Sequence, residues 1–333
     1  MTQAHSIPTQ LDDATRPRVS PKPLEVSFAV GDRLASRYYL LEELGRGAMG
    51  IVYRAADLRE GGFVAIKLVP KLGQSTEAAR FQRGTEIMLG LDHPALCRAF
   101  ACGRSTECCY AVMEDLTGPS LDMAFAPGQR LPGTRAARLV AGLCEGLEVL
   151  HARGFVHRDL KPSNLVLRGR GEAESLVLID FDLAKPFGPN LADSGRISRS
   201  ALRSAGLTAG KGLSGTPVYM SAERLQGRAA TPDSDVFAAG LVLYQLLMGR
   251  LPTAGHDHAS LQLLIAARAR SAPAVPTSSE ISPRLAQIIQ RALAPKLADR
   301  YPSALALAHD LRSLEPLSQR PTRSLVALRA VSA

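Results

Sequence analysis

The spacing of apolar residues predicts the main regular elements of the C-terminal two thirds of this chain. One set recurs at steps of three and four residues, as the buried face of an α-helix requires. Its members are Leu139, Leu143, Leu147 and Leu150. Thr134, just before them, is a suitable N-cap. A second helix-forming run extends from Val236 to Met248 and is opened by Asp235, whereas the short, wholly apolar run 176–179 favours a buried strand.

The N-terminal third has a different pattern. From Tyr38 to about Cys109, short strand-like runs alternate with one helix, and a further strand is predicted over 110–116. Residues 168–174 form a polar hairpin loop between two apolar runs. The first 33 residues are rich in Pro, Ser, Thr and charge, which is typical of a flexible arm, and residues 316–333 form a short basic tail.

Composition is that of one globular enzyme. The chain has 333 residues, 46% of them hydrophobic, which is enough for one large domain with tails and too little for a second domain. The five cysteines lack Cys-x-x-Cys spacing, so metal ligation by cysteine is not expected, and reduced thiols are the favoured interpretation. No apolar run reaches the roughly 18 residues of a spanning helix and the N-terminus lacks a signal-peptide core, so we expect a cytoplasmic protein with no membrane anchor.

The formal net charge of +9 raises the question of a nucleic-acid partner. Aromatic residues are only 5% of the chain, tryptophan is absent and the basic residues are scattered, so no platform for base stacking is visible. We therefore favour a solvated basic surface and expect no nucleic-acid partner.

The most informative stretch is His157-Arg158-Asp159-Leu160-Lys161-Pro162-Ser163-Asn164. It places an acid, a cation and a carboxamide at the spacing found in phosphoryl-transfer loops. Upstream, the segment 44–53 is rich in glycine, and glycines let backbone amides approach phosphates. A dinucleotide-binding fold uses similar glycines but continues into a helix, whereas Ile51, Val52 and Tyr53 favour a strand. Lys67 follows seventeen residues after Gly50, at the end of Val64-Ala65-Ile66.

Further motifs follow in order along the C-terminal half. Asp180 comes directly after the apolar run 176–179, and Gly215-Thr216-Pro217 precedes Tyr219-Met220-Ser221-Ala222-Glu223. With these motifs, the region from Tyr38 to Leu314 resembles the serine/threonine protein kinases, especially the eukaryotic-like kinases of bacteria. The lysine at position 161 points to serine or threonine acceptors, because tyrosine kinases usually lack it.

The resemblance implies an α+β fold with two lobes, a small β-rich N-lobe and a larger, mostly helical C-lobe. The implied boundaries are an N-terminal arm at 1–36, a kinase domain at 37–315 with lobes at about 37–112 and 117–315, and a tail at 316–333. The implied activity is transfer of the ATP γ-phosphate to protein Ser/Thr hydroxyls, with Mg²⁺ and possible use of Mn²⁺.

The resemblance also implies a role for each motif residue. Asp159 would take the hydroxyl proton, Lys161 and Lys67 would neutralise phosphate charge, and Asn164 and Asp180 would hold the metal. The residues expected to surround ATP are Leu44, Gly45, Gly47, Gly50, Val52, Ala65, Lys67, Glu114 and Leu116. Glu223 is expected to pair with Arg300, and Asp235 to brace the catalytic loop from below.

Three departures from the family pattern bear on activity. Gly84 stands nine residues before His93, where related kinases carry a helix glutamate, and Glu86 would lie about 200° further round the helix, facing away from Lys67. If the missing acid limits activity, Gly84→Glu should raise the rate. Asp182 replaces the glycine of Asp-Phe-Gly, where aspartate would tolerate a positive φ. Ala222 replaces a proline, which we expect to be mild.

These departures keep two alternatives open. One is a pseudokinase scaffold that binds partners, and perhaps nucleotide, with little or no transfer. The other is a small-molecule phosphotransferase of the same fold, which Lys161 and the segment 215–223 disfavour.

The resemblance also predicts a phosphorylation switch. Arg158 is the residue that binds a phosphorylated activation loop in related kinases, and a buried cation needs an anionic partner. The candidate phosphate acceptors are Ser194, Ser198, Ser200, Ser204, Thr208 and Ser214. Thr216 is excluded from this set, because the resemblance gives it a contact with the catalytic aspartate and lysine, a substrate-docking role.

Overall fold

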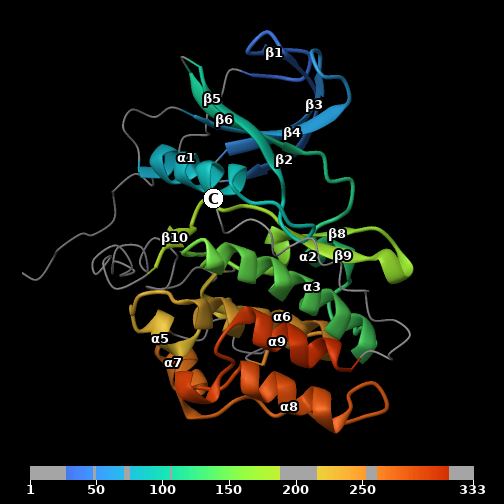
Figure 1. Ribbon diagram of the computed structural model, residues 1–333, viewed down its shortest axis with the longest axis vertical. Coiled ribbons are helices and arrows are strands. Elements are labelled where there is room, and N and C mark those ends of the chain that lie inside the picture. The colour runs from blue at the N-terminus through green and yellow to red at the C-terminus, as the bar shows by residue number, and fades with distance from the viewer. Residues whose placement is uncertain are drawn as a thin grey trace, which may run out of the picture.

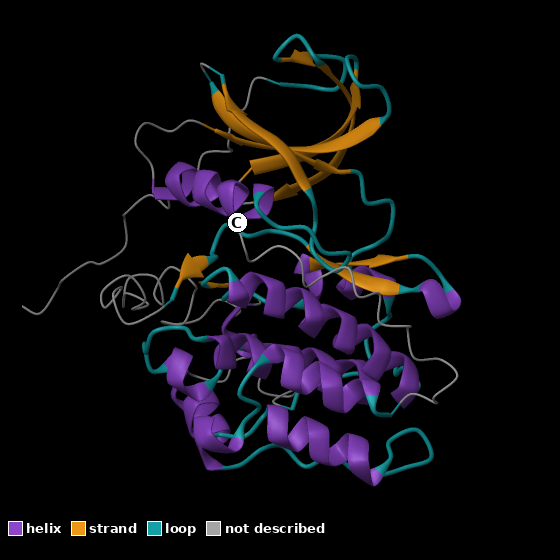
Figure 2. Ribbon diagram, viewed as in Figure 1, coloured by secondary structure: helices purple, strands orange, loops and turns teal. Residues whose placement is uncertain are grey.

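The computed structural model describes residues 28–47, 50–70, 76–105, 107–187, 216–252 and 261–314. These residues form a curved sheet with one helix above a larger, mainly helical part (Figure 1). Coloured by secondary structure, the long strands lie in one lobe together with one helix, and the other helices lie in the second lobe (Figure 2). The expected two-lobed α+β fold is confirmed.

The N-lobe is built on a six-stranded antiparallel sheet with the strand order β1-β2-β3-β4-β6-β5. Its strands are β1 (Arg33–Leu34), β2 (Tyr38–Gly47), β3 (Gly50–Asp57), β4 (Phe63–Pro70), β5 (Ala99–Arg104) and β6 (Cys108–Glu114). Helix α1 (Thr76–Leu89) lies between β4 and β5 in sequence and packs beside the sheet (Figure 1). The strand expected at Ile51–Tyr53 is confirmed as part of β3.

Successive side chains of each strand point to opposite faces of this sheet, so one set is buried in the N-lobe core and the other faces the C-lobe. Ile51, Tyr53, Ile66 and Leu68 pack with one another in a buried apolar cluster on one face. The intervening residues of the same strands, among them Lys67, point to the opposite face, toward the C-lobe. The sheet therefore buries its own core and presents the second face to the site described below.

The expected N-terminal arm, residues 1–36, overlaps the described N-lobe at residues 28–36. Leu34 pairs with Tyr38 and is almost fully buried, and the Tyr53 hydroxyl donates to the Phe28 carbonyl at 2.9 Å. Residues 28–36 thus belong to the N-lobe because their apolar side chains complete its core. Residues 1–27 of the arm and 315–333, which include the tail, lie outside the described residues.

The C-lobe has α3 and α6 at its centre, with other helices around them (Figure 1). Its α-helices are α2 (Leu121–Ala124), α3 (Gly133–Ala152), α5 (Ala222–Leu225), α6 (Pro232–Met248), α7 (Leu261–Arg270), α8 (Pro283–Ala292) and α9 (Ala304–Arg312). Short 3₁₀ turns occur at η1 (Pro162–Asn164), η2 (Gly171–Ala173), η3 (Thr216–Tyr219) and η4 (Leu297–Asp299). No described helix is long and apolar enough to cross a membrane.

The predicted helices are present with shifted starts. The leucines at 139, 143, 147 and 150 are buried, as their spacing predicts. Helix α3 begins at Gly133 after Pro132, so Thr134 is a helical residue and not the N-cap. Helix α6 begins three residues before Asp235, because Thr231 and Ser234 form a capping box around Pro232.

Two small antiparallel pairs lie under the N-lobe. One joins β7 (Phe155–Val156) to β10 (Lys185–Pro186), and the other joins β8 (Leu165–Arg168) to β9 (Ser175–Leu178) across the predicted polar loop. The chain leaving α1 pairs with β9, since Cys97 N donates to Leu178 O at 2.9 Å and Leu178 N donates to Ala95 O at 2.8 Å. These bonds tie the N-lobe helix to the strand that leads into the site.

A buried ion pair fixes the lower part of the C-lobe. Arg300 Nη1 donates to Glu223 Oε1 at 2.9 Å, and other guanidinium nitrogens donate to the Ala294 carbonyl at 2.9 and 3.1 Å. The Arg300 side chain is 0% exposed. Burial would raise the pKa of Glu223, but hydrogen bonds from Arg300 and Ser221 and the charge of Arg300 together lower it.

We expect Arg300→Ala to lower the free energy of unfolding by about 3–5 kcal/mol, because it leaves the Glu223 carboxylate buried and unpaired. Arg284→Ala is the matched control, since Arg284 is half exposed and pairs with Asp310 at 3.3 Å, and its loss should cost under about 1 kcal/mol. Urea unfolding of both variants measures the difference. Equal losses would contradict a special role for the buried pair.

Candidate active site

The N-lobe supplies Lys67 from the middle of its sheet. Lys67 on β4 lies directly opposite Val52 on β3, and Ala65, two residues earlier, lies opposite Met113 on β6. Directly opposed residues of antiparallel strands share a face, and so do residues two apart in one strand. The amine of Lys67 therefore lies beside a small apolar surface made by Val52, Ala65 and Met113.

The glycines that precede Lys67 differ in whether the fold could accommodate a side chain at their positions. At Gly50 a β-carbon would collide with the Leu68 carbonyl oxygen, and φ is +152°, so the fold itself needs glycine there. A β-carbon at Gly45 or Gly47 would meet no atom of the described residues within 4 Å. These two glycines leave open space at the end of the β2–β3 pair, next to the exposed Leu44.

The strand expected to contact adenine lies at the edge of this surface. Glu114 ends β6, its backbone N–H donates to Arg98 O at 3.0 Å, and its carboxylate pairs with Arg168 at 2.7 Å. Leu116, two residues later, packs against the C-lobe core. The chain passes from the N-lobe to the C-lobe through these two residues.

The catalytic-loop motif forms a compact group around Asp159. Lys161 Nζ donates to Asp159 Oδ2 at 2.7 Å, and the Asn164 amide donates to Asp159 O at 2.9 Å and to Oδ2 at 3.2 Å. Asp159 Oδ1 is buried and has no hydrogen-bond partner among the described residues. One carboxylate oxygen is thus held by the protein, and the other can accept a hydrogen bond from a substrate hydroxyl.

Asp235 lies beneath this loop. Its Oδ2 accepts from His157 N at 2.8 Å, its Oδ1 accepts from Arg158 N at 2.9 Å, and His151 Nε2 lies 2.8 Å from Oδ2. Burial would raise the pKa of Asp235, but the hydrogen bond and charge of His151 outweigh it, so the pKa is lowered. The buried carboxylate is anionic and fixes the backbone of the loop.

Asn164 and Asp180 are brought side by side by the β8–β9 pair. Ile179 N donates to Asn164 O at 2.9 Å, so Asp180 follows immediately beside Asn164. Because the Asn164 amide nitrogen donates to Asp159, its amide oxygen is available as a metal ligand. Amide and carboxylate oxygens are ligands that Mg²⁺ prefers, so these two side chains suit a divalent cation.

The turn at Asp180 corrects one expectation from the sequence. Asp180 itself has φ +65°, whereas Asp182 is not among the residues with positive φ. The phenyl ring of Phe181 is buried and stands edge-on against the His157 ring at 5.1 Å. The turn therefore does not require a glycine-like conformation at position 182, and its aspartate is free to serve another purpose.

Lys67 is paired with two carboxylates. Its Nζ lies 2.6 Å from Asp182 Oδ2 and 3.3 Å from Asp180 Oδ1. Burial would lower the pKa of Lys67, but the charges of Asp180 and Asp182 outweigh it and raise that pKa. Burial raises the pKa of Asp182 to about 6, with attraction to Lys67 opposing the shift. For Asp180, attraction to Lys67 outweighs burial and lowers the pKa.

Helix α1 reaches this pair through Gly84. A β-carbon on Gly84 would lie 2.6 Å from the Phe181 carbonyl oxygen and 3.0 Å from Asp182 N, so the helix backbone rests against the backbone of this turn. Glu86 is exposed and accepts from Gln82 at 3.0 Å, facing away from Lys67 as its position on the helix predicts. The contact reverses the expectation for Gly84→Glu, which should lower the rate because the new side chain must displace the turn.

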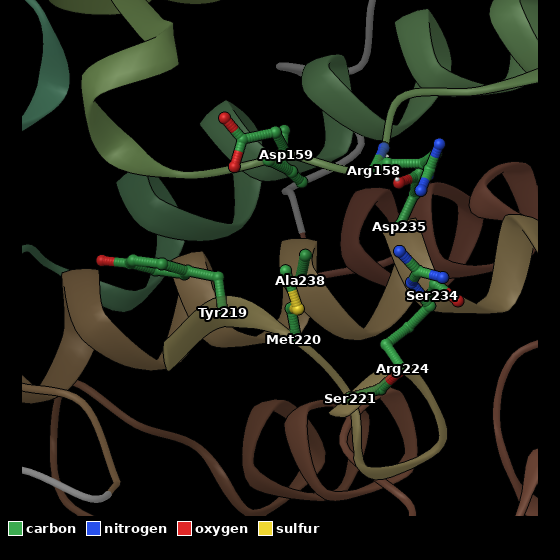
Figure 3. A pocket seen from close by; sticks show the side chains of 10 residues that line it. Arg158, Asp159, Tyr219, Met220, Ser221, Arg224, Ser234, Asp235 and Ala238 are labelled. Atoms are coloured by element: carbon green, nitrogen blue, oxygen red, sulfur yellow. Dashed lines mark hydrogen bonds between the residues drawn. The ribbon is translucent and has the colours of Figure 1, made fainter. Parts of the chain in front are cut away.

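A basic pocket lies beside the catalytic loop (Figure 3). The guanidinium groups of Arg158 and Arg224 approach each other next to Asp235 (Figure 3), and Arg158 Nε is buried without a hydrogen-bond partner among the described residues. Burial and repulsion from Arg224, Arg80 and Arg83 lower the pKa of Arg158 to about 10. Backbone φ at Arg158 is +75°. Two arginines and two aspartates, Asp159 and Asp235, line the pocket, and the positive charge that exceeds theirs comes from Arg80, Arg83 and Lys185 nearby.

Several predicted residues fall outside what is described. The phosphate acceptors proposed between Ser194 and Ser214 lie outside the described residues, and so does the side chain of Thr216, which begins η3. Ala222 begins α5 in place of the expected proline. Sequence reasoning missed Asp182 as the partner of Lys67, although an acid two residues after Asp180 and a glycine at the helix position were both visible.

The fold has two lobes, and the residues singled out from the sequence gather where the lobes meet. The family model of the protein kinase domain matches residues 38–311. The chain belongs to the protein kinase family.

The curated relatives are serine/threonine kinases of bacteria. The chain is 32% identical over 291 residues to "Serine/threonine-protein kinase pkn2" of Myxococcus xanthus, covering 84% of this chain and 33% of the relative. It is 34% identical over 307 residues to Pkn1 of the same organism, and the match covers 89% of this chain and 40% of the relative. It is 34% identical over 295 residues to PkaA of Streptomyces coelicolor, and that match covers 84% of this chain and 50% of the relative. The chain thus spans between a third and a half of the length of these relatives.

We expect Gly84→Ala to destabilise the protein by about 1–3 kcal/mol, because the methyl group overlaps the Phe181 carbonyl. Intrinsic helix propensity alone would favour alanine by about 1 kcal/mol. Gly142→Ala in α3 is the matched control, since a β-carbon there would meet, among the described residues, only the Arg312 side chain at 3.8 Å. This control substitution should raise the free energy of unfolding. Urea unfolding compares the two. A stabilised Gly84→Ala variant would contradict the close contact.

Proposed function

We propose that this chain transfers the γ-phosphoryl group of ATP to serine or threonine hydroxyls of protein substrates. The observation that carries the proposal is the group around Asp159, where one carboxylate oxygen is held by Lys161 and Asn164 and the other is buried without a partner among the described residues. A carboxylate in this state can orient a hydroxyl and take its proton.

The remaining residues act by position and charge. Lys161, held against Asp159, lies where it can neutralise the phosphoryl group as it moves, and Lys67 offers its amine to the phosphates from the N-lobe. Asn164 and Asp180 would hold Mg²⁺, with Mn²⁺ as a possible substitute. When bound, the metal neutralises charge on the phosphate oxygens. The glycines at 45 and 47 leave room for the phosphates, and Leu44, Val52, Ala65, Glu114 and Leu116 would surround the adenosine.

The choice of acceptor rests on Lys161 and on the names of the relatives, which are serine/threonine kinases. The use of ATP and the five free cysteines support a cytoplasmic location for the proposed activity, because the cytoplasm is reducing. A pseudokinase was suggested by Gly84 and Asp182, but Lys67 has a close carboxylate partner all the same. No feature of the described residues favours that alternative.

Asp159→Ala and Asp180→Ala should each abolish phosphotransfer, and Lys67→Met should do the same, because each removes a charge that acts on hydroxyl, metal or phosphate. The assay uses labelled ATP with Mg²⁺ and a generic protein acceptor, followed by phosphoamino-acid analysis. Glu172→Gln is the control, since this glutamate is an exposed acid in the β8–β9 loop. Transfer by Asp159→Ala at the wild-type rate would refute the proposed function, as would a wild-type chain that transfers nothing.

We also propose that the pocket at Arg158 receives a phosphate from residues between Asp180 and Glu223. Arg158, Arg224, Arg80, Arg83 and Lys185 all contribute positive charge around one point. Like charges held together are destabilising, and a phosphate carrying about −1.5 to −2 charges relieves the repulsion. The candidate acceptors remain Ser194, Ser198, Ser200, Ser204, Thr208 and Ser214.

Phosphatase treatment should lower the rate of an active preparation at least about 5-fold, a typical size for a switch of this kind. Arg158→Gln should have a low rate that phosphatase no longer changes, whereas Arg170→Gln, an exposed arginine, should respond as wild type does. Mass spectrometry identifies the modified residues. An active protein without phosphate on any of the six candidates would contradict the switch.

A further inference from the structure

Two of the departures from the family pattern meet at one point of the structure. Position 84 has lost the helix acid, and position 182 has gained an acid. In space, Gly84 lies against the Phe181 carbonyl and Asp182 N, while the Asp182 carboxylate lies 2.6 Å from Lys67 Nζ. The carboxylate that the helix lacks is therefore supplied by the turn that the helix touches.

We propose that Asp182 is the positioning residue of Lys67, and that it holds the lysine for the nucleotide phosphates in place of an acid on helix α1. The inference rests on the proposed function for its role in catalysis. It concerns residues of this chain alone, so nucleotide binding can test it without phosphotransfer.

Burial makes this ion pair effective. The side chain of Asp182 is 7% exposed and that of Lys67 is 13% exposed, so solvent screens their attraction weakly. At 2.6 Å the contact is a charge-assisted hydrogen bond, which fixes direction as well as distance. Phe81 on α1 adds its ring face, 5.7 Å from Lys67 Nζ. The long lysine side chain is thereby held in one place before the nucleotide arrives.

The two aspartates of the turn differ in their surroundings. Asp180 is 34% exposed and its contact with Lys67 is longer, at 3.3 Å. The partly exposed carboxylate of Asp180 is accessible to a metal, whereas the buried carboxylate of Asp182 is occupied by the lysine. Because Asp182 pairs with Lys67, Asp180 need not serve as the main counter-ion of the lysine and is available to bind the metal.

The exchange also requires the glycine on the helix. A side chain at position 84 would push the backbone of residues 181 and 182 away from α1, because its β-carbon would lie 2.6 Å from the Phe181 carbonyl oxygen. The acid at 182 and the glycine at 84 are thus one arrangement. A consequence is that Lys67 is held by the segment carrying the metal ligand Asp180, and not by the helix.

A double-mutant cycle between Lys67 and Asp182 tests the inference. The affinity for ATP without metal, in EDTA, is measured by equilibrium titration for the wild type, Asp182→Asn, Lys67→Met and the double variant. Asp182→Asn keeps the shape and removes the charge, so we expect at least about 10-fold weaker binding. In the Lys67→Met background the same change should alter affinity by less than about 2-fold, because the charge acts only through the lysine.

Two further variants separate positioning from folding. Asp182→Glu keeps the charge and should retain most of the affinity, and Glu86→Gln, the exposed acid on α1, should bind as wild type does. Thermal unfolding of each variant verifies that the fold is intact. Phosphotransfer with Mg²⁺ should follow the same order, with kcat reduced in Asp182→Asn.

The outcomes are distinct. Unchanged or tighter ATP binding in Asp182→Asn would overturn the inference, since it would make Asp182 a bystander or a clamp that keeps Lys67 from the nucleotide. Equal losses with and without Lys67 would overturn it too. If the wild type binds ATP and transfers no phosphate, the proposed function fails while the cycle still decides the role of Asp182.

Discussion

The carboxylate of Asp235 is the group around which the catalytic loop is built. It accepts hydrogen bonds from two consecutive backbone amides, those of His157 and Arg158, and lies 2.8 Å from His151. Arg158 has φ +75°, a conformation that costs a non-glycine residue about 1–3 kcal/mol unless its surroundings impose it. The buried anion of α6 imposes it, because two amides can reach the carboxylate only when the chain turns in this way.

The turn at Arg158 orients the side chains of the catalytic loop. Asp159 comes next, with Oδ2 bonded to Asn164 and Lys161 and Oδ1 without a hydrogen-bond partner among the described residues. Arg158 points the other way, toward Arg224 in the basic pocket (Figure 3). A single buried charge thus connects the helix below, the proposed catalytic base above and the pocket proposed to sense phosphate beside it.

The N-lobe is joined to this loop by charge and by close packing. Lys67 extends from the sheet to Asp180 and Asp182, and helix α1 approaches the same turn as closely as a glycine allows. Buried charges of opposite sign are favourable only when the geometry is maintained, and here the backbone contact at Gly84 maintains it. The pair and the contact therefore depend on each other, which is why an isolated change at either position should disturb both.

Much of this protein follows from local sequence. The β-branched and aromatic residues at Ile51–Tyr53 predicted a strand, and the three-to-four spacing of leucines predicted the buried face of α3. The motifs from Lys67 to Asp180 predicted the two-lobed fold and which residues gather. Element starts were less well determined, as at Thr134, because capping depends on a few local bonds. Leu34 was assigned to the arm because the strand that contains it, Arg33–Leu34, is too short to show an alternation of apolar and polar residues.

The role of Asp182 was decided only by the tertiary structure. From the sequence, a glycine at 84 and an acid at 182 were two separate losses, since nothing local connects residues almost a hundred positions apart. Packing of α1 against the turn places them in contact, and the distance of 2.6 Å between Asp182 and Lys67 then makes them one arrangement. Sequence determines which charges a chain carries. Which of them meet is determined by the fold, because electrostatic attraction depends on distance and burial and not on order along the chain.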